Sequence, residues 1–400
     1  MREMKDSGVP WLKEIPVSWK VERGKNILVL QKRPVRDNDE VVTCFRDGEV
    51  ILRSLRRTEG FTMSDKEIGY QGINEGDIVI HGMDGFAGAM GVSKSTGKGS
   101  PVLIVCTLKY DAIPQFIIYY LRALAMTDVF VALATGIRER SCDLRWNKVS
   151  ELEFIMPSSV EQQKIAEFLD RKCAEVDEMI GLQEQIIEEL KAYKQSVITE
   201  AVTKGLNPNA PMRDSGIEWI GQIPEHWEVT KLKFYASIDS GDAISNEQIS
   251  EEGDYPVYGG GDIMGYYSDY NTTEDKLIIG RVGARCGCVT LLKQRCWASD
   301  NALVLKSALP LKYTYHLLQA IDLNRLNTSN AQPLITATKV KNVFIPLTPL
   351  AEQQAIADYL DEKCADIDSL IQTKQSKIDS LKEYKKSIIY EYVTGKREVE

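Results

Sequence analysis

Short loops rich in arginine and lysine recur along the chain, and their side chains are suited to binding a polyanion. Arginine can donate two hydrogen bonds to a guanine edge, and both arginine and lysine can contact phosphate. Asparagine and glutamine can pair with adenine, and a tyrosine beside glycines could line a groove. The residues that we therefore expect to contact DNA are Arg53, Arg56, Arg57, Arg138, Arg140, Arg145, Asn147, Tyr258, Arg281, Arg285, Lys293, Arg295, Asn301 and Gln332. The competing interpretation of each basic residue is a solvated surface charge.

The sequence lacks the residue sets of common catalytic sites. It has no G-x-x-x-x-G-K-[ST] phosphate loop and no N/D-P-P-Y/F motif of an adenine methyltransferase. Only three histidines are present, His81, His226 and His316, which argues against a histidine-based metal site. We find no paired nucleophile and base, so we expect no catalytic residue and no enzymatic activity.

The eight cysteines also lack the spacing of a metal site. Cys286 and Cys288, with Cys296 nearby, have no fourth ligand at finger-like spacing. The charged N-terminus has no apolar core, and no run of 18 apolar residues occurs. We therefore expect no bound metal or cofactor, reduced thiols, no membrane association and a cytoplasmic location.

The elements that must position these residues form a tandem repeat. Residues 6–19 match residues 214–227 at seven of fourteen positions, including the tryptophans Trp11/Trp219 and Trp19/Trp227. Residues 161–203 match residues 352–394 without a gap at 22 of 43 positions. The stretches between these boxes do not align obviously. The chain therefore has two constant frames that carry two different inserts, and the inserts should perform two distinct tasks.

The two longer boxes predict long amphipathic helices. Pro157-Ser158 and Thr348-Pro349 are start signals, and Gly205 and Gly395 are plausible stops. Apolar residues and cysteines recur every three or four positions, which is typical of a coiled-coil seam. The predicted seam residues are Ile165, Leu169, Cys173, Val176, Ile180, Ile187, Leu190 and Val197, with Ile356, Leu360, Cys364, Ile367, Ile371, Ile378, Leu381 and Ile388. We expect the helices to pack antiparallel on each other; alternatively, each packs on its own globular region.

The inserts have the pattern of mixed α/β domains. Short β-branched runs separated by glycines predict strands at 76–93 and 101–110 in the first insert, and at 255–270, 275–292 and 296–306 in the second. Each insert then has one expected helix, at 115–133 or 311–321, and an exit strand.

The expected fold class is α+β, with two diverged α/β domains separated by two long helices that form an antiparallel coiled coil. The expected boundaries are 1–157 and 205–348 for the two domains with their short boxes, and 158–204 and 349–400 for the helices.

The net charge of −9 argues mildly against nucleic-acid binding only if it is taken as a total. Residues 158–204 carry −4 and residues 349–400 carry −3, whereas the inserts at 20–148 and 228–348 carry +3 and −1. The acidic residues therefore concentrate on the helices. The near-neutral inserts predict modest DNA affinity for the chain alone.

The repeated motifs resemble the specificity (S) subunit of type I restriction-modification systems. The resemblance rests on the W-x₃-IP-x₂-W boxes that end at Trp19 and Trp227, and on the EQQ-x-IA-x₂-LD segments from Glu161 to Asp170 and from Glu352 to Asp361. Further similar segments are LRWNKVSELEF, IGRVG with CG, and W-x-SDNA in the inserts. The resemblance spans almost the whole chain.

The resemblance implies a non-catalytic subunit of a restriction and adenine-methyltransferase complex. Each insert would be a target-recognition domain for one half of a bipartite, asymmetric site in double-stranded DNA, and the helices would set the spacer. Two modification (M) subunits would dock on the constant parts, and restriction (R) subunits would join them. S-adenosylmethionine, ATP and magnesium would be bound by those partners. The family pattern does not identify base-contacting residues in the inserts.

Two other classes of protein compete with this interpretation. A coiled-coil scaffold or adaptor without DNA recognition would need neither basic loops nor two inserts. A nuclease or stand-alone methyltransferase would need the catalytic motifs that the sequence lacks.

Overall fold

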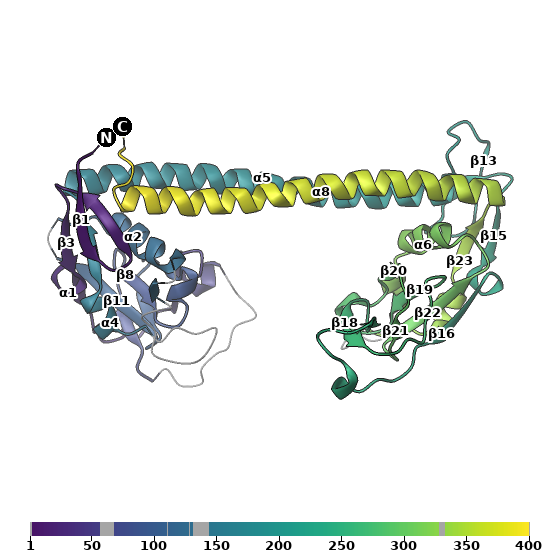
Figure 1. Ribbon diagram of the computed structural model, residues 1–400, viewed down its shortest axis with the longest axis horizontal. Coiled ribbons are helices and arrows are strands. Elements are labelled where there is room, and N and C mark those ends of the chain that lie inside the picture. Colours follow the sequence, from purple (N-terminus) through teal and green to yellow (C-terminus); the bar gives the residue numbers. More distant parts are fainter. Residues whose placement is uncertain are drawn as a thin grey trace. The chain divides into compact units, whose positions relative to one another are not determined.

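The computed structural model describes residues 2–56, 68–109, 111–127, 129–130, 144–327 and 333–399. The chain forms two compact units, one of Met1–Leu182 with Lys377–Glu400 and the other of Gln183–Ser376 (Figure 1). The boundary between the units falls within both long helices, so each unit contains part of α5 and part of α8. The two units are described separately.

A four-stranded antiparallel sheet with the order β4-β11-β8-β9 is the centre of the first unit. A β1-β2 hairpin carries the first short box, and the exit strand β12 pairs with β3. The elements that precede the long helix are β1 (Met4–Val9), β2 (Leu12–Pro16), β3 (Lys20–Arg23), α1 (Gly24–Ile27), β4 (Leu28–Leu30), β5 (Val42–Cys44), β6 (Val50–Leu52), η1 (Arg53–Leu55), β7 (Gln71–Ile73), β8 (Ile78–His81), η2 (Gly85–Ala87), β9 (Met90–Val92), β10 (Gly97–Gly99), β11 (Leu103–Leu108), α2 (Pro114–Met126), α4 (Trp146–Glu151) and β12 (Glu153–Met156).

The second unit has an equivalent sheet with the order β16-β22-β19-β20, and a further sheet with the order β18-β17-β21. Its exit strand β23 pairs with β15. The elements between the long helices are β13 (Met212–Asp214), β14 (Gln222–Pro224), β15 (Glu228–Lys231), η3 (Leu232–Phe234), β16 (Ala236–Ser240), η4 (Asn246–Gln248), β17 (Tyr255–Tyr258), β18 (Ile263–Tyr267), β19 (Leu277–Gly280), η5 (Gly283–Arg285), β20 (Val289–Leu291), β21 (Trp297–Ala298), β22 (Ala302–Ser307), α6 (Leu311–Ala320), η6 (Leu323–Leu326), α7 (Ala337–Lys341) and β23 (Phe344–Leu347).

The two central sheets share one strand register. His81 of β8 pairs with Leu103 of β11, and Gly280 of β19 pairs with Ala302 of β22. The neighbouring pairs continue in step along both strands, so each residue of one sheet has a defined counterpart in the other. The prediction of an α+β fold built from two diverged copies of one domain is therefore confirmed.

Both faces of each central strand are buried, which explains why these strands read as continuous apolar runs. Ile78 and Ile80 of β8 pack in the core that contains helix α2, whereas Val79 faces the core beneath β5 and β6. In the second unit, Ile279 packs in the core with helix α6, and Ile278 faces Cys296 and its neighbours.

The long helices are α5 (Ser159–Lys204) and α8 (Leu350–Val393). In the first unit, Ile165 and Leu169 near the start of α5 share a core with Val393 at the end of α8. In the second unit, the end of α5 and the start of α8 share a core in the same way, for example Val202 with Leu360. The helices are therefore antiparallel within each unit. Each also packs on its own domain, because the same cores contain α2 and α6.

The predicted seam is correct where both helices begin and near the end of α8, where Ile378, Leu381 and Ile388 are buried, but it shifts near the end of α5. Cys173 and Cys364 are buried, as expected. Leu190 and Val197 are only half-buried, and the buried positions move to Ile198 and its neighbours. An α-helix with 3.6 residues per turn rotates away from a 3.5-residue repeat, so the buried stripe drifts around the helix.

The two long helices are joined by two ion pairs, and both ion pairs involve the same two positions of the repeat. Lys385 Nζ lies 2.6 Å from a carboxylate oxygen of Asp177, and Lys194 Nζ lies 2.7 Å from one of Asp368. Lys194 aligns with Lys385, and Asp177 aligns with Asp368. Each ion pair thus joins the same two repeat positions with the helices exchanged. Exposed pairs of this kind contribute only about 0–1 kcal/mol each, so they favour the register of the helices more than their stability.

Helix α2 ends at Met126, so the helix predicted at 115–133 is interrupted at Thr127, and Val129 and Phe130 are again helical. The Thr127 hydroxyl donates a hydrogen bond to the carbonyl oxygen of Ala123 or Leu124, each 3.2 Å away, and so caps the last turn. Residues 131–133 lie outside the described residues. In the part of the chain that the structure describes, no helix is both long and apolar enough to cross a bilayer.

Replacement of Leu360 by alanine should destabilise the second unit by about 2–5 kcal/mol, because Leu360 is fully buried and its loss would leave a cavity. The matched control is Leu370→Ala on the same helix, where the side chain is 50% exposed. Urea unfolding followed by circular dichroism would measure both variants. Equal destabilisation by the two substitutions would contradict the assignment of the buried stripe.

Candidate nucleic-acid interface

The last tryptophan of each short box donates a hydrogen bond to a glutamate in the first turn of a long helix. The indole Nε1 of Trp19 donates to Glu161 of α5 at 3.0 Å, and that of Trp227 donates to Glu352 of α8 at 3.0 Å. Both tryptophans are fully buried. A carboxylate near a helix N-terminus is favoured by the helix dipole, so the pairing suits both the helix and the indole.

The same two tryptophan rings lie against the ends of the opposite helices. A side chain at Gly205, which follows α5, would come within 3.1 Å of Trp227, and one at Gly395, after α8, within 3.1 Å of Trp19. These glycines have φ values of +74° and +72°, as expected at a helix C-terminus. Each tryptophan therefore joins the start of one long helix to the end of the other within its unit.

The last residue of each EQQ-x-IA-x₂-LD segment is an aspartate that contacts the helix of the insert in the same unit: Asp170 contacts α2, and Asp361 contacts α6. Tyr119 of α2 donates its hydroxyl proton to Asp170 at 2.7 Å. In the second unit, Lys312 Nζ and His316 Nε2 lie 2.6 and 2.8 Å from Asp361. These motif residues therefore hold each insert on the helices.

Two of these acids have lowered pKa values in the second unit. Burial alone would raise the pKa of Asp361, but hydrogen bonds from Lys312 and His316 lower it further than burial raises it. The pKa of Glu352 is lowered in the same way by His226 and Trp227 against the effect of burial. The folded state thus favours both carboxylates in their charged form.

In the second unit, predicted site residues meet at one edge of the central sheet. Arg281 follows β19, and its guanidinium donates to Ser240 Oγ at the end of β16 and to the carbonyl oxygen of Asp300 before β22, at 3.3 and 3.2 Å. Asn301 lies beside it, exposed, and its carbonyl accepts from the Arg281 backbone NH at 3.1 Å. The edge therefore presents a positioned guanidinium next to an exposed amide, a combination suited to base edges.

The equivalent edge of the first unit has different side chains on the same backbone. The counterpart of Arg281 is Gly82, by sheet register. Leu144 donates its NH to the Gly82 carbonyl at 2.9 Å, just as Ile335 does to that of Arg281 at 2.9 Å. A Cβ at Gly82 would meet two carbonyl oxygens, so no side chain fits there. The two edges thus share a frame but differ in chemistry.

The predicted residues of the first insert are only partly available for contacts. Arg56 is held by Asp47 and Glu49, which it contacts at 2.5 and 3.0 Å, and it stacks on Phe45. Arg53 donates to Thr43 Oγ1 at 3.2 Å.

Near the exit strand, Arg145 and Asn147 are exposed at the start of α4, away from the Arg53 and Arg56 loop in sequence. Three of the residues of this insert that were expected to contact DNA lie outside the described residues: Arg57, Arg138 and Arg140.

Two further predicted arginines of the second insert have different partners. Arg285 makes an ion pair with Asp262 at 3.0 Å, close to Arg281 in sequence. Arg295 instead donates to the hydroxyl of Tyr270 at 2.9 Å and lies over its ring.

Lys293, near Arg295, is exposed, whereas Tyr258 is half-buried and packs on the core around Ile278 and Cys296. Burial raises the pKa of Tyr258. Gln332 lies outside the described residues.

The described cysteines are unpaired, and most are buried. Burial raises the pKa of Cys44, Cys106 and Cys296 to about 12, which keeps them as thiols at neutral pH. No group of three metal-binding side chains occurs within the described ranges of the chain.

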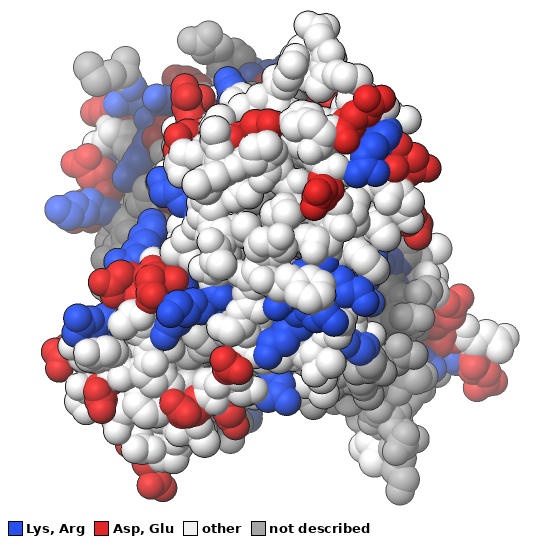
Figure 2. Space-filling model, turned by 90° about the vertical axis from the view of Figure 1, so that its right-hand side faces the viewer, with Lys and Arg blue, Asp and Glu red and all other residues white. Residues whose placement is uncertain are grey.

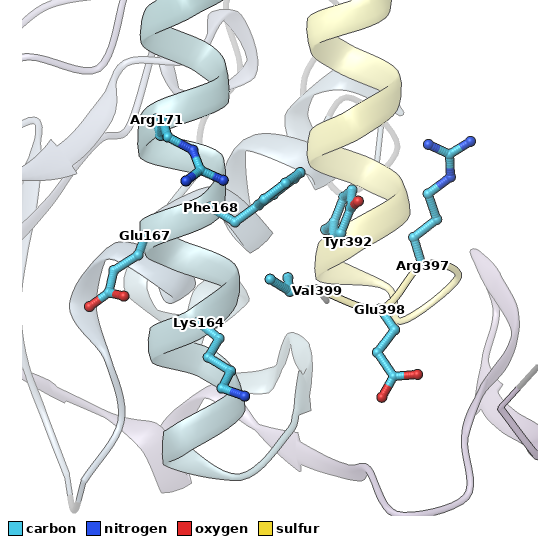
Figure 3. A pocket seen from close by; sticks show the side chains of 8 residues that line it. All are labelled: Lys164, Glu167, Phe168, Arg171, Tyr392, Arg397, Glu398 and Val399. Carbon is cyan, nitrogen blue, oxygen red and sulfur yellow. The ribbon is translucent and has the colours of Figure 1, made fainter.

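A groove of about 710 Å³ lies in the first unit between α5 and the segment after α8. Phe168 of α5 and Tyr392 of α8 both line it, and their rings are in contact, with centroids 4.4 Å apart (Figure 3). Lys164, Arg171 and Arg397 are among the charged side chains that line it. The groove belongs to the constant part of the chain, outside the inserts.

Sequence reasoning recognised the boxes but missed how they are connected. The tryptophan–glutamate pair recurs in both copies, as do the lysine–aspartate pairs between the helices. Complementary residue types conserved between two repeats of one chain are a usable signal for such contacts.

Residues 224–394 match the family model described as the type I restriction modification DNA specificity domain. The putative MjaX specificity subunit of Methanocaldococcus jannaschii is 24% identical, covering 96% of this chain and 94% of that protein. The MjaVIII specificity subunit of the same organism is also 24% identical, covering 96% and 93%. The EcoprrI specificity subunit of Escherichia coli is 30% identical, but over only 34% of each chain.

Two solved structures have a similar fold. A chain from a study of complex assembly and conformational transition of the type I R-M system matches with a TM-score of 0.72 at 16% identity, covering 96% of this chain and 99% of that one. The HsdS subunit of Thermoanaerobacter tengcongensis matches with a TM-score of 0.50 at 18% identity, covering 96% and 98%.

The lowered pKa values of Glu352 and Asp361 predict a pH-dependent stability of the second unit. A carboxyl with a lowered folded pKa contributes stability above its unfolded value, here 4.5 or 3.8, and loses it as the pH falls through the folded value. The Glu352→Gln, Asp361→Asn variant should therefore be less stable than the parent at pH 7, with the difference shrinking below about pH 4.5. Urea midpoints measured between pH 7 and pH 3 test this. A difference that stays constant over that range would contradict it.

Proposed function

The chain belongs to the family of type I restriction-modification specificity subunits, and we propose that each of its inserts reads one half of a bipartite, asymmetric DNA site. The observation that carries the proposal is the shared register of the two central sheets combined with different side chains at their edges. Two copies of one domain with different edges suit two half-sites of different sequence.

The DNA contacts that specify sequence are proposed at the edge formed by Ser240, Arg281 and Asn301 in the second unit, and at the equivalent edge in the first. Positioned arginine and exposed amide groups can discriminate base edges in the major groove. The other exposed basic residues, such as Lys293, would contact phosphates, which carry no direct sequence information.

The long helices are proposed to set the spacer between the half-sites. Helix α5 has 46 residues, which at about 1.5 Å per residue gives a length of roughly 70 Å. Their apolar stripes and reciprocal ion pairs favour one register, so helix length rather than sliding would fix the distance.

Specificity subunits are non-catalytic; type I complexes also contain modification and restriction subunits, which carry the catalytic activities. We propose that two modification subunits dock on the constant parts of this chain, one for each copy of the repeated boxes. S-adenosylmethionine, ATP and magnesium would be bound by the partners and not by this chain. A scaffold without DNA recognition does not account for the match to a DNA specificity domain.

Replacement of residues 20–148 by the corresponding insert of another specificity subunit should change one half of the methylated site and leave the other half and the spacer unchanged. The reason is that Trp19, Glu161 and Asp170, which hold the insert on the helices, lie outside the replaced segment, whereas the sheet edge lies within it. Methylome sequencing of cells that carry the chimera would show the new site. A change in both halves would refute the modular assignment.

Deletion of seven residues from each long helix, at aligned positions 183–189 and 374–380, should shorten the spacer by about three base pairs. Seven residues correspond to roughly 10 Å of helix, the apolar seam stays in phase, and duplex DNA rises about 3.4 Å per base pair. The control removes seven residues from α8 alone, which shortens only one of the two paired helices and should reduce methylation without a defined new spacer. An unchanged spacer after the double deletion would contradict the proposal.

A further inference from the structure

The two units differ in charge where the exit strand begins. Helix α4 ends at Glu151, and the aligned residue after α7 is Asn342. In the first unit, Glu151 makes ion pairs with both Arg23 and Lys25, the latter at 2.8 Å. Arg23 at the end of β3 and Lys25 in α1 are therefore both paired with this one carboxylate.

The strand register identifies the counterparts of these residues in the second unit. Arg23 pairs with Glu153 across β3 and β12, and Lys231 pairs with Phe344 across β15 and β23. Lys233 then corresponds to Lys25. The second unit thus has both basic residues, but Asn342 and Phe344 stand at the positions that Glu151 and Glu153 occupy in the first unit.

A third lysine adds to the same surface. Lys341 occupies the position of Ser150, so five aligned positions with no net charge in the first unit carry three lysines and no acid in the second. Lys341 has one carboxylate near it, Asp239 at 4.0 Å. Among the described residues, no carboxylate lies within ion-pair distance of Lys231 or Lys233.

The ammonium groups of Lys231 and Lys233 lie against aromatic rings rather than carboxylates. Lys231 Nζ lies 5.1 Å from the ring centroid of Phe344, and Lys233 Nζ lies 5.3 Å from that of Phe234. The ring of Phe234 is itself 70% exposed. A ring face attracts an ammonium group without cancelling its charge, so the charge remains available for an anion. Lysine and arginine side chains form a band across this side of the second unit (Figure 2).

We propose that the lysine face, formed by Lys231, Lys233 and Lys341 with Phe234 and Phe344, binds the phosphate backbone of duplex DNA. The proposal rests on the proposed function and deepens it, because it assigns to the second unit a backbone contact that the first unit lacks at the equivalent place. Lysines without carboxylate partners suit phosphates, whereas lysine is depleted in protein–protein interfaces. The face supplies affinity that does not depend on sequence, and the sheet edge supplies specificity.

The test measures binding of the full-length chain to a duplex that contains its site and to a scrambled duplex, over a range of salt concentrations. Each phosphate contact contributes about 0.9 to the slope of log affinity against log salt. The Lys231→Gln, Lys233→Gln variant should lower the magnitude of the slope by about 2 on both duplexes, with their affinity ratio unchanged.

A second variant keeps all lysines and restores the arrangement of the first unit. Asn342→Glu places a carboxylate where Glu151 stands, on a backbone that already tolerates it in the other copy, and should lower the slope by about 1 to 2. The matched control is Lys363→Gln, Lys377→Gln, which removes the same charge from exposed positions of α8 and should leave the slope unchanged.

An unchanged slope in both lysine-face variants would overturn the proposal. So would unchanged DNA binding combined with lost co-purification of the modification subunit, which would identify the face as a protein interface. The proposed function is judged separately, by whether the unaltered chain with its modification subunit prefers the site over the scrambled duplex. The two claims can therefore fail independently.

Discussion

Two buried tryptophans, Trp19 and Trp227, determine where the inserts begin relative to the long helices. Each hydrogen-bonds to a glutamate in the first turn of one helix, and its ring packs on the glycine that ends the other. Each tryptophan also directly precedes an insert. The inserts cannot move relative to the helix ends in their own unit without breaking a part-buried hydrogen bond and exposing a buried indole, and both changes are costly.

This constraint separates the constant part of the molecule from the variable part. The tryptophans, the paired carboxylates and the reciprocal lysine–aspartate contacts recur in both halves because they do the same work twice. The sheet edges do not recur, since Arg281 stands where the first unit has Gly82. The side chains at the sheet edges can therefore change while the contacts that hold each insert on the helices stay the same. This is the physical basis for treating the two inserts as independent in DNA recognition.

The repeat made much of the frame predictable. It placed both long helices, their glycine ends and most of their buried stripe, including Cys173 and Cys364. The candidate site was less predictable, because the environment of an arginine depends on partners that only the fold brings close. Arg56 looked free in sequence but is held by two acids, and Arg281 gained its position from strands 41 and 19 residues away in the chain. The counterparts Glu151 and Asn342 became meaningful only once the strand register was known.

Site-specific photo-crosslinking tests the central claim most directly. Val102 and Asn301 are equivalent positions in the two units, since each precedes the strand that pairs with β8 or β19. A photoreactive residue placed at either position, in the complex with the modification subunits on a duplex with the recognised site, should crosslink to one half-site only, and to a different half for each position. Crosslinks from both positions to the same half-site would contradict the account.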